Sequence, residues 1–152
     1  MYELRREQAI PQPLEAVFEF FADAANLEVI TPPWLNFRIL TPPPIAMQPG
    51  TLIDYRISWK GLPLRWRTRI EEWEPGKRFV DTQVRGPYAL WHHTHIFAPH
   101  PGGVHMTDIV KYSLPLGPLG RLAHAIMVRR DVHAIFDYRF RVIEKLLGRA
   151  TA

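Results

Sequence analysis

Hydrophobic and polar positions recur along this chain with two different periods. Where every second side chain is apolar, the pattern is typical of a strand with one buried face. Apolar side chains three and four positions apart are typical of an amphipathic helix. The first pattern predicts seven strands, at residues 2–10 and at about 36–41, 51–60, 63–74, 78–85, 88–97 and 104–114. The second predicts short helices at 13–22 and 24–30 and a long helix at about 117–147.

The order of these elements predicts an α+β fold. Turns that contain glycine, often beside proline, separate most of the strands, as at Pro75-Gly76 and Gly102-Gly103. Consecutive strands joined by short turns form an antiparallel sheet, and one long amphipathic helix packed on that sheet makes a layered fold. No repeat, linker or change in composition interrupts the 152 residues, so we expect a single domain over residues 1–152.

The long helix has a hydrophobic seam that two polar residues interrupt. From Leu122 to Leu147 the seam positions are spaced alternately by four and three, and all are apolar except Arg129 and His133. A charge in a dry seam is unfavourable unless it is paired or hydrated. The seam therefore predicts a polar or hollow space beneath the middle of the helix.

Strand alternation predicts which side chains face this space. A two-residue turn at Gly86-Pro87 places Val84 on the same inward face as His93, and it places Asp81 on the outward face. A bulge in this hairpin would reverse the assignment. The inward positions whose side chains we expect to contact a ligand are Trp59, Trp66, Trp91, His93, His95, Met106, Asp108 and Tyr112, together with Phe136 of the long helix.

Five polar side chains are expected to converge beneath the long helix: His93, His95, Asp108, Arg129 and His133. If Phe97 pairs with Val104, His93 lies opposite Asp108, which would orient the imidazole and raise its basicity as a general base requires. Arg129 would then bind a carboxylate, phenolate or enolate oxygen. The alternatives are a structural hydrogen bond between His93 and Asp108, and an Arg129 that pairs with a carboxylate or reaches solvent.

The spacing of His93 and His95 is also compatible with a metal site. Two histidines on one strand face, completed by Asp108 or His133, would offer three or four zinc ligands. Such a pair is common by chance, so an organic ligand is the stronger prediction, and we expect neither a metal nor a cofactor. The chain has no cysteine, and it lacks a P-loop, a dinucleotide-binding glycine pattern and a nucleophile elbow.

The positive charge of the chain is concentrated in its last part. The net charge is +4, and the residues from 117 onward contain seven basic and three acidic side chains, which accounts for the whole imbalance. A basic helix can face nucleic acid or anionic lipid. No nucleic-acid-binding motif accompanies it, so we expect no nucleic-acid partner and at most a transient contact with a membrane surface. The first residues lack the apolar segment of a secretory signal, and we expect a cytoplasmic protein.

Several motifs resemble a known superfamily. They are 70–76 (IEEWEPG), 79–81 (FVD), 86–88 (GPY), 91–97 (WHHTHIF) and 112–117 (YSLPLG). Together with the element order they are similar to the START-like, helix-grip (SRPBCC) superfamily, in particular its polyketide cyclase/dehydratase and lipid-transport group. The resemblance implies a curved seven-stranded antiparallel sheet that grips the C-terminal helix around a cavity. It also implies an entrance past loops at about 31–34, 42–50 and 61–63.

The sequence leads to two main hypotheses of function. In the first, the protein binds or transfers a small, mostly apolar molecule, lipid-, quinone- or polyketide-like, whose one polar end the charged cluster holds. In the second, it is a cyclase, aromatase or dehydratase in which His93 removes a proton, Asp108 aligns the imidazole and Arg129 stabilises the enolate. A third hypothesis is a protein-interaction or membrane-surface module that uses the basic helix.

Overall fold

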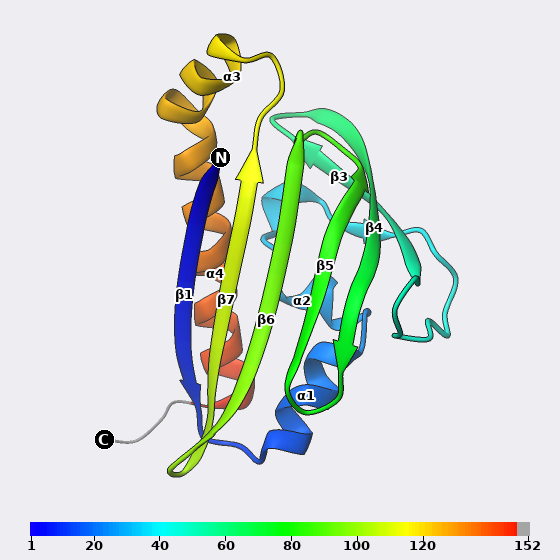
Figure 1. Cartoon of the computed structure of the whole chain (residues 1–152), viewed down its shortest axis with the longest axis vertical. Helices are drawn as coiled ribbons and strands as arrows, with labels where there is room; N and C mark the ends of the chain where they lie inside the picture. The colour runs from blue at the N-terminus through cyan, green and yellow to red at the C-terminus, as the bar shows by residue number, and fades with distance from the viewer. Residues whose placement is uncertain (149–152) are drawn as a thin grey trace.

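The computed structural model describes residues 1–148 and consists of a curved antiparallel sheet and a long C-terminal helical segment (Figure 1). The strands are β1 (Tyr2–Ile10), β2 (Arg38–Ile39), β3 (Leu52–Trp59), β4 (Leu62–Glu74), β5 (Arg78–Arg85), β6 (Leu90–His100) and β7 (Gly103–Ser113). They lie in the order β1-β7-β6-β5-β4-β3-β2, so consecutive strands pair from β2 to β7 and β1 completes the edge beside β7. The seven-stranded antiparallel sheet is confirmed, although β2 has two residues where six were expected.

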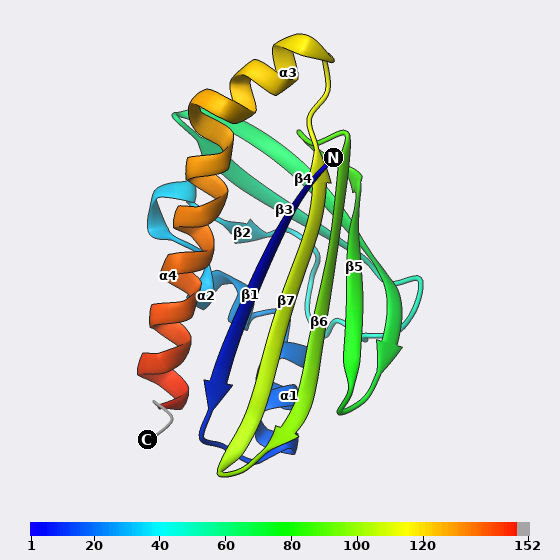
Figure 2. The ribbon, with the colours of Figure 1, turned by 60° about the vertical axis from the view of Figure 1, so that its left-hand side comes forward.

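The helices follow the predicted order, and the C-terminal one has an internal irregularity. The short helices α1 (Leu14–Ala22) and α2 (Asn26–Ile30) precede a single 3-10 turn, η1 (Pro33–Leu35). The C-terminal segment consists of α3 (Pro118–Ala123), the π-helical η2 (His124–Val128) and α4 (Arg129–Leu147). Figure 2 shows α4 running beside β1 and α3 projecting past the end of the sheet. No helix among the described residues is long and apolar enough to span a membrane.

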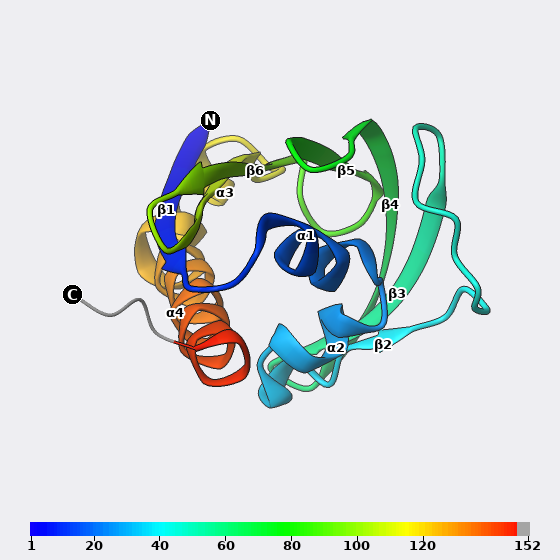
Figure 3. The same ribbon diagram turned by 90° about the horizontal axis from the view of Figure 1, so that it is seen from below.

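The main hydrophobic core fills the end of the fold at which α1 lies. The apolar spacing of α1 buries Val17, Phe18 and Phe21, which pack with Phe97 of β6 and Ile143 of α4. Burying a large apolar side chain contributes about 1.5–3 kcal/mol. Viewed from this end, α1 lies between α4 and the sheet (Figure 3). Since these side chains close one end of the fold, open space between the sheet and the C-terminal helix is left toward the other end.

The pairing of β5 with β6 differs from the prediction by one residue. Asp81 lies opposite His93, and the ladder ends at the next pair. The side chain of Gln83 accounts for the difference, because its amide donates to the carbonyl of Tyr88 and accepts from the Tyr88 amide, which closes a wider turn than two residues. A shift of one residue exchanges the two faces of a strand. Asp81 is therefore inward and Val84 is 46% exposed, so both predicted orientations were wrong.

The pairing of β6 with β7 differs by two residues, which leaves the faces unchanged. Phe97 lies opposite Met106, and His95, not His93, lies opposite Asp108. Because side chains alternate with a period of two, His93, His95 and Asp108 still point to the same side of the sheet. The predicted partner was wrong, but the predicted inward face of both strands is correct.

Candidate functional site

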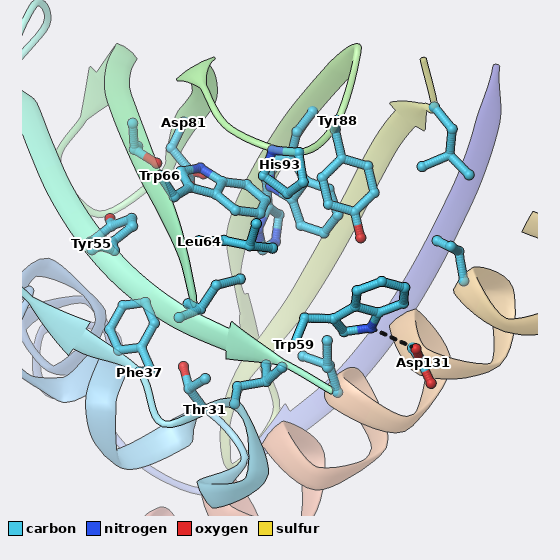
Figure 4. A pocket seen from close by; sticks show the side chains of 18 of the residues that line it. Thr31, Phe37, Tyr55, Trp59, Leu64, Trp66, Asp81, Tyr88, His93 and Asp131 are labelled. Atoms are coloured by element: carbon cyan, nitrogen blue, oxygen red, sulfur yellow. Dashed lines mark hydrogen bonds between the residues drawn. The ribbon is translucent and has the colours of Figure 1, made fainter. Parts of the chain in front are cut away.

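A pocket of about 370 Å³ lies between the concave face of the sheet and the C-terminal helical segment (Figure 4). Strands β3 to β6 form one wall, and residues from Leu114 to Arg139 form the other. Most of the lining is aromatic or aliphatic, and it includes Leu35, Phe37, Ile57, Trp59, Leu64, Trp66, Tyr88, Trp91, Val128 and Ile135. Cavities of about 300–1,000 Å³ with such walls are typical of sites for small organic molecules.

The tryptophans are held in place by contacts with one another and with α4. Trp66 of β4 and Trp91 of β6 meet edge to face with ring centroids 5.3 Å apart, and Tyr88 packs against both. Trp59, at the end of β3, donates its indole N–H to Asp131 of α4 over 2.9 Å (Figure 4). This bond joins the sheet to the helix across the pocket and fixes the width of the pocket at that point.

The polar groups of the site gather on one side of the pocket. His93 Nε2 lies 2.8 Å from Asp108 Oδ1, and His95 Nε2 lies 2.7 Å from Asp81 Oδ2. His95 Nδ1 lies 3.3 Å from Asp108 Oδ1, and Arg139 Nη2 lies 3.5 Å from the same oxygen. The two imidazole rings stack with centroids 3.7 Å apart. Two carboxylates, one guanidinium and two imidazoles therefore form one continuous network under α4.

His95 bridges the two carboxylates, with Nε2 toward Asp81 and Nδ1 toward Asp108, and its Nδ1 also lies 3.5 Å from Arg139 Nη2. Burial alone would lower the pKa of its imidazole, but the hydrogen bonds and the negative charges of Asp108 and Asp81 together raise that pKa above its ordinary value. Burial also raises the pKa of the Asp108 carboxyl, yet the charge of Arg139 and the hydrogen bonds of both histidines hold it well below its usual range. Burial likewise raises the pKa of Asp81, but the hydrogen bond from His95 and the neighbouring positive charges together lower it.

His93 is neutral at physiological pH. Burial lowers the pKa of its imidazole to about 4, and the neighbouring charge of His95 acts in the same direction. Because ionised Asp108 can only accept, His93 donates its Nε2–H to that carboxylate, and its Nδ1 is left with a lone pair. Among residues 1–148 no group hydrogen-bonds Nδ1, and His93 lines the pocket. Nδ1 is therefore an acceptor available to a ligand.

Arg139 is the only cationic side chain of the described pocket lining besides the histidines. Arg139 is buried, with 8% of its surface exposed. Its guanidinium carbon lies 5.5 Å from the ring centroid of Phe21 and 5.8 Å from that of Phe136. Its Nε has no hydrogen-bond partner among the described residues. The two carboxylates, Asp81 and Asp108, face the guanidinium of Arg139 and the imidazole of His95.

Three members of the cluster could also act as metal ligands. Asp81, His93 and His95 each offer one ligand atom, and these atoms lie within 4.8 Å of one another. Donors of this kind suit zinc and other first-row ions. The Nε2 atoms of both histidines face carboxylates, and Arg139 lies beside Asp108, so these side chains already have partners without a cation. The absence of a metal remains a prediction.

The structure brings five of the predicted ligand-contacting residues to the pocket wall: Trp59, Trp66, Trp91, His93 and His95. Asp108 is not part of the wall but lies behind both histidines. Phe136 is buried with its ring 5.5 Å from that of His93. Met106 belongs to the closed core around α1, and the Tyr112 hydroxyl is hydrogen-bonded to His124 over 2.8 Å. These two side chains support the site from outside the pocket.

Arg129 and His133 do not lie where the seam predicted them. Arg129 is exposed, and His133 is half-buried and accepts a hydrogen bond from Arg6 of β1 over 3.0 Å. The buried face of α4 consists of Val132, Phe136, Arg139 and Ile143. The helix is therefore rotated about its axis relative to the prediction. The stripe that is buried contains one charged residue, Arg139. The π-helical turn before α4 also shifts the residues that precede it around the helix axis, so they do not continue the same face.

Sequence reasoning missed the two charged residues that the pocket contains instead, Asp81 and Arg139. Arg139 follows Val132 and Phe136 by seven and three positions, so it shares a helical face with them, and this spacing is visible in the sequence. Asp81 could not be found in this way, since its orientation depends on the one-residue shift at Gln83. The lining includes Thr31 of the first predicted entrance loop, but no residue from the other two, 42–50 and 61–63.

The sheet, the gripping helix and the pocket between them define the helix-grip class of ligand-binding folds. The chain belongs to the family described as polyketide cyclase / dehydrase and lipid transport, which matches residues 10–150. No curated protein matches the chain at a significant level.

Solved structures support the same fold over nearly the whole chain. Protein CV1439 from Chromobacterium violaceum is 16% identical, with a TM-score of 0.71 and coverage of 99% of this chain and 100% of that one. Ms6760 from Mycobacterium smegmatis is 17% identical, with a TM-score of 0.71 and coverage of 95% and 90%. Ara h 8.0201 is 17% identical, with a TM-score of 0.67 and coverage of 96% and 97%. At these identities the similarity concerns the fold.

Proposed function

We propose that this protein binds a small, mostly apolar molecule in the pocket and hydrogen-bonds one polar end of it at the charged cluster. The observation that carries the proposal is the distribution of the lining: aromatic and aliphatic walls, with His93, Asp81 and Arg139 together on one side. A ligand that buried about 300 Å² of apolar surface would gain about 7 kcal/mol before the costs of association. Membership of a lipid-transport and cyclase family supports such a role.

The chemistry of the cluster limits the polar end of the ligand. His93 Nδ1 can accept a hydrogen bond from a hydroxyl, and the guanidinium of Arg139 can donate to a carbonyl or carboxylate oxygen. Because Asp81 and Asp108 already face His95 and Arg139, the cluster suits a neutral or weakly acidic polar group better than a cation. We therefore expect hydroxyl, carbonyl or carboxylic acid groups, attached to a flat or chain-like apolar body.

The first test is native mass spectrometry of freshly purified protein, with organic extraction of whatever remains bound. A fatty acid, quinone or aromatic polyketide would support the proposal and identify the ligand class. A pocket-filling variant provides the control: Ala123→Phe on the lining should reduce ligand carried through purification, whereas Ala125→Phe, exposed two residues later, should not. Equal ligand content in both variants would place the ligand elsewhere.

A pair of fluorescent probes tests the polar end separately. Anilinonaphthalene sulfonate and phenyl-naphthylamine share an apolar body, but only the first is an anion. Arg139→Gln should weaken the anionic probe more than the neutral one, and Arg129→Gln should affect neither. If Arg139→Gln weakened both probes equally, the role of Arg139 in holding the polar end would be wrong.

One observation favours an enzymatic role as a second candidate function. The Nε2–H of His93 points at an ionised carboxylate, so a proton taken up at Nδ1 would give an imidazolium that Asp108 stabilises. In a cyclase or dehydratase of this design, His93 would take a proton from a carbon next to a carbonyl, and Arg139, in place of Arg129, would stabilise the enolate oxygen. The low pKa of His93, about 4, makes it a weak base, which is why binding is our first proposal.

One variant distinguishes ligand binding from catalysis. His93→Gln keeps a donor toward Asp108 but cannot accept a proton, so it should bind the neutral probe like the wild type. Absence of polyketone turnover by the wild type would remove the enzymatic candidate and leave ligand binding intact, and turnover that survived in His93→Gln would refute the role of His93 as the base.

A further inference from the structure

The helices α3 and η2 carry a row of large apolar side chains that the fold leaves exposed. Leu119, Leu122 and Ile126 are three and four positions apart and are 67%, 56% and 65% exposed. Leu116, just before α3, is 74% exposed. Single exposed apolar residues are ordinary on a protein surface, but a contiguous row of them is typical of a surface that binds a partner or a membrane.

Three exposed arginines accompany this row of apolar side chains. Arg121, Arg129 and Arg130 are exposed, and none of them forms an ion pair with another residue among 1–148. The sequence contains no acidic residue between Asp108 and Asp131. A helix with an apolar face and basic flanks complements an anionic lipid surface, where headgroups meet the arginines and the apolar side chains enter the acyl boundary.

The row is held in a fixed position at the pocket. A Cβ on Gly120 would lie 2.1 Å from the carbonyl oxygen of Pro115, so α3 packs directly against the segment that leads into it. Leu116 and Leu119 line the pocket as well as being exposed, and the pocket therefore reaches solvent beneath α3. Figures 1 and 2 show α3 beyond the end of the sheet, away from the closed core at α1.

We propose that α3 and η2 form a docking surface for an anionic lipid bilayer, made of Leu116, Leu119, Leu122, Ile126, Arg121, Arg129 and Arg130. In the docked state the apolar row lies among the lipid headgroups and the open end of the pocket faces the membrane. An apolar ligand then moves between bilayer and pocket without crossing water. Only this transfer step rests on the proposed ligand binding; docking itself requires no ligand.

Flotation with vesicles tests the docking directly. The wild type should float with phosphatidylserine-containing vesicles at low salt, and it should float poorly with phosphatidylcholine alone or at high salt, because salt screens exposed charges. Arg121→Gln with Arg130→Gln should lower the partition coefficient about 25-fold, at about fivefold for each arginine. The matched control, Arg141→Gln with Lys145→Gln, removes the same charge from the far end of α4 and should change it much less.

The apolar contribution has its own pair of variants. Leu122→Ser with Ile126→Ser, which do not line the pocket, should reduce vesicle binding at both salt concentrations. Leu52→Ser with Leu146→Ser, exposed to 44% and 50%, should not. If either variant fails to fold, a probe replaces it: the chain has no cysteine, so a dye on Leu122→Cys should shift to the blue with vesicles, and one on Leu146→Cys should stay unchanged.

Several outcomes would overturn the proposal. They are the absence of flotation with phosphatidylserine vesicles at low salt, equal losses from the two arginine pairs, and equal dye shifts at both positions. A dimer that Leu122→Ser with Ile126→Ser dissociates, without vesicle binding, would assign the row to contacts between copies of the chain. Probe binding in the pocket without docking would refute this inference alone, and docking without probe binding would refute the proposed function alone.

Discussion

His93 is expected to make the folded protein lose stability in mild acid. Its side chain is 6% exposed, and burial lowers the pKa of its imidazole from 6.5 to about 4, with the charge of His95 acting in the same direction. The unfolded chain takes up this proton at about pH 6.5, whereas the folded protein resists it until about pH 4. Since the unfolded state binds more protons between these values, stability contributed by neutral His93 is lost as the pH falls through that window.

The size of the effect follows from the shift. One pKa unit corresponds to about 1.4 kcal/mol, so the difference between 6.5 and about 4 represents about 3 kcal/mol in full. Between about pH 7.5 and about pH 4.5 the wild type should lose about 2–3 kcal/mol through this residue. That is a large share of a total stability of about 5–15 kcal/mol.

Urea unfolding across this pH range is the assay. His93→Gln keeps a hydrogen-bond donor for Asp108 but does not titrate, so its free energy of unfolding should fall by about 2 kcal/mol less than that of the wild type over the range. His100→Gln, at an exposed histidine, should keep the wild-type slope. The comparison uses slopes, so a constant packing cost of the glutamine does not affect it. If His93→Gln lost as much stability in acid as the wild type, the reasoning from a buried, neutral His93 would be refuted.

Three further predictions concern the network and the pocket. Arg139→Met should destabilise the protein by about 3 kcal/mol or more, because it leaves buried carboxylates uncompensated, while Arg129→Met should change urea unfolding by less than about 0.5 kcal/mol. Trp59→Phe removes the donor to Asp131 and should lower the free energy of unfolding by about 1 kcal/mol. Hydrogen exchange in the first turns of α4 should become faster. Unchanged exchange would mean that this bond does not hold α4 to the end of β3. The raised pKa of His95 contributes stability that is fully present below about pH 6.5 and is lost as the pH rises through the higher folded value. NMR should find His95 protonated at a pH where His93 is neutral, and the reverse order would contradict the assigned network.

Local periodicity was sufficient for the fold because it repeats many times. Each strand from β3 to β7 is at least eight residues long, and the glycine-containing turns between several of them favour antiparallel neighbours. The same alternation placed Trp59, Trp66 and Trp91 on the concave face, where they line the pocket. Their binding of a ligand remains a prediction. An orientation that depends on alternation within one strand survives a register error of two residues, as the pairing of His95 with Asp108 shows.

The charged residues were harder to predict because each depends on a single geometric event. Asp81 faces inward since Gln83 bonds both the amide and the carbonyl of Tyr88 and widens one turn by a residue. Arg139 replaces Arg129 since the helix packs through a stripe next to the expected one. Neither event changes the average pattern of hydrophobic positions.

Periodic patterns over many residues encode the order of the elements, the antiparallel sheet, the long C-terminal helix and the aromatic face of the pocket. The placement of Asp81 and Arg139 in the site, with Arg129 exposed on the surface, follows from packing between elements. A buried charge requires partners at hydrogen-bond distance, and those partners come from β5, β6, β7 and α4. Their relative positions depend on a one-residue register and on which of two adjacent stripes of the helix packs inward, and the sequence pattern allows both choices.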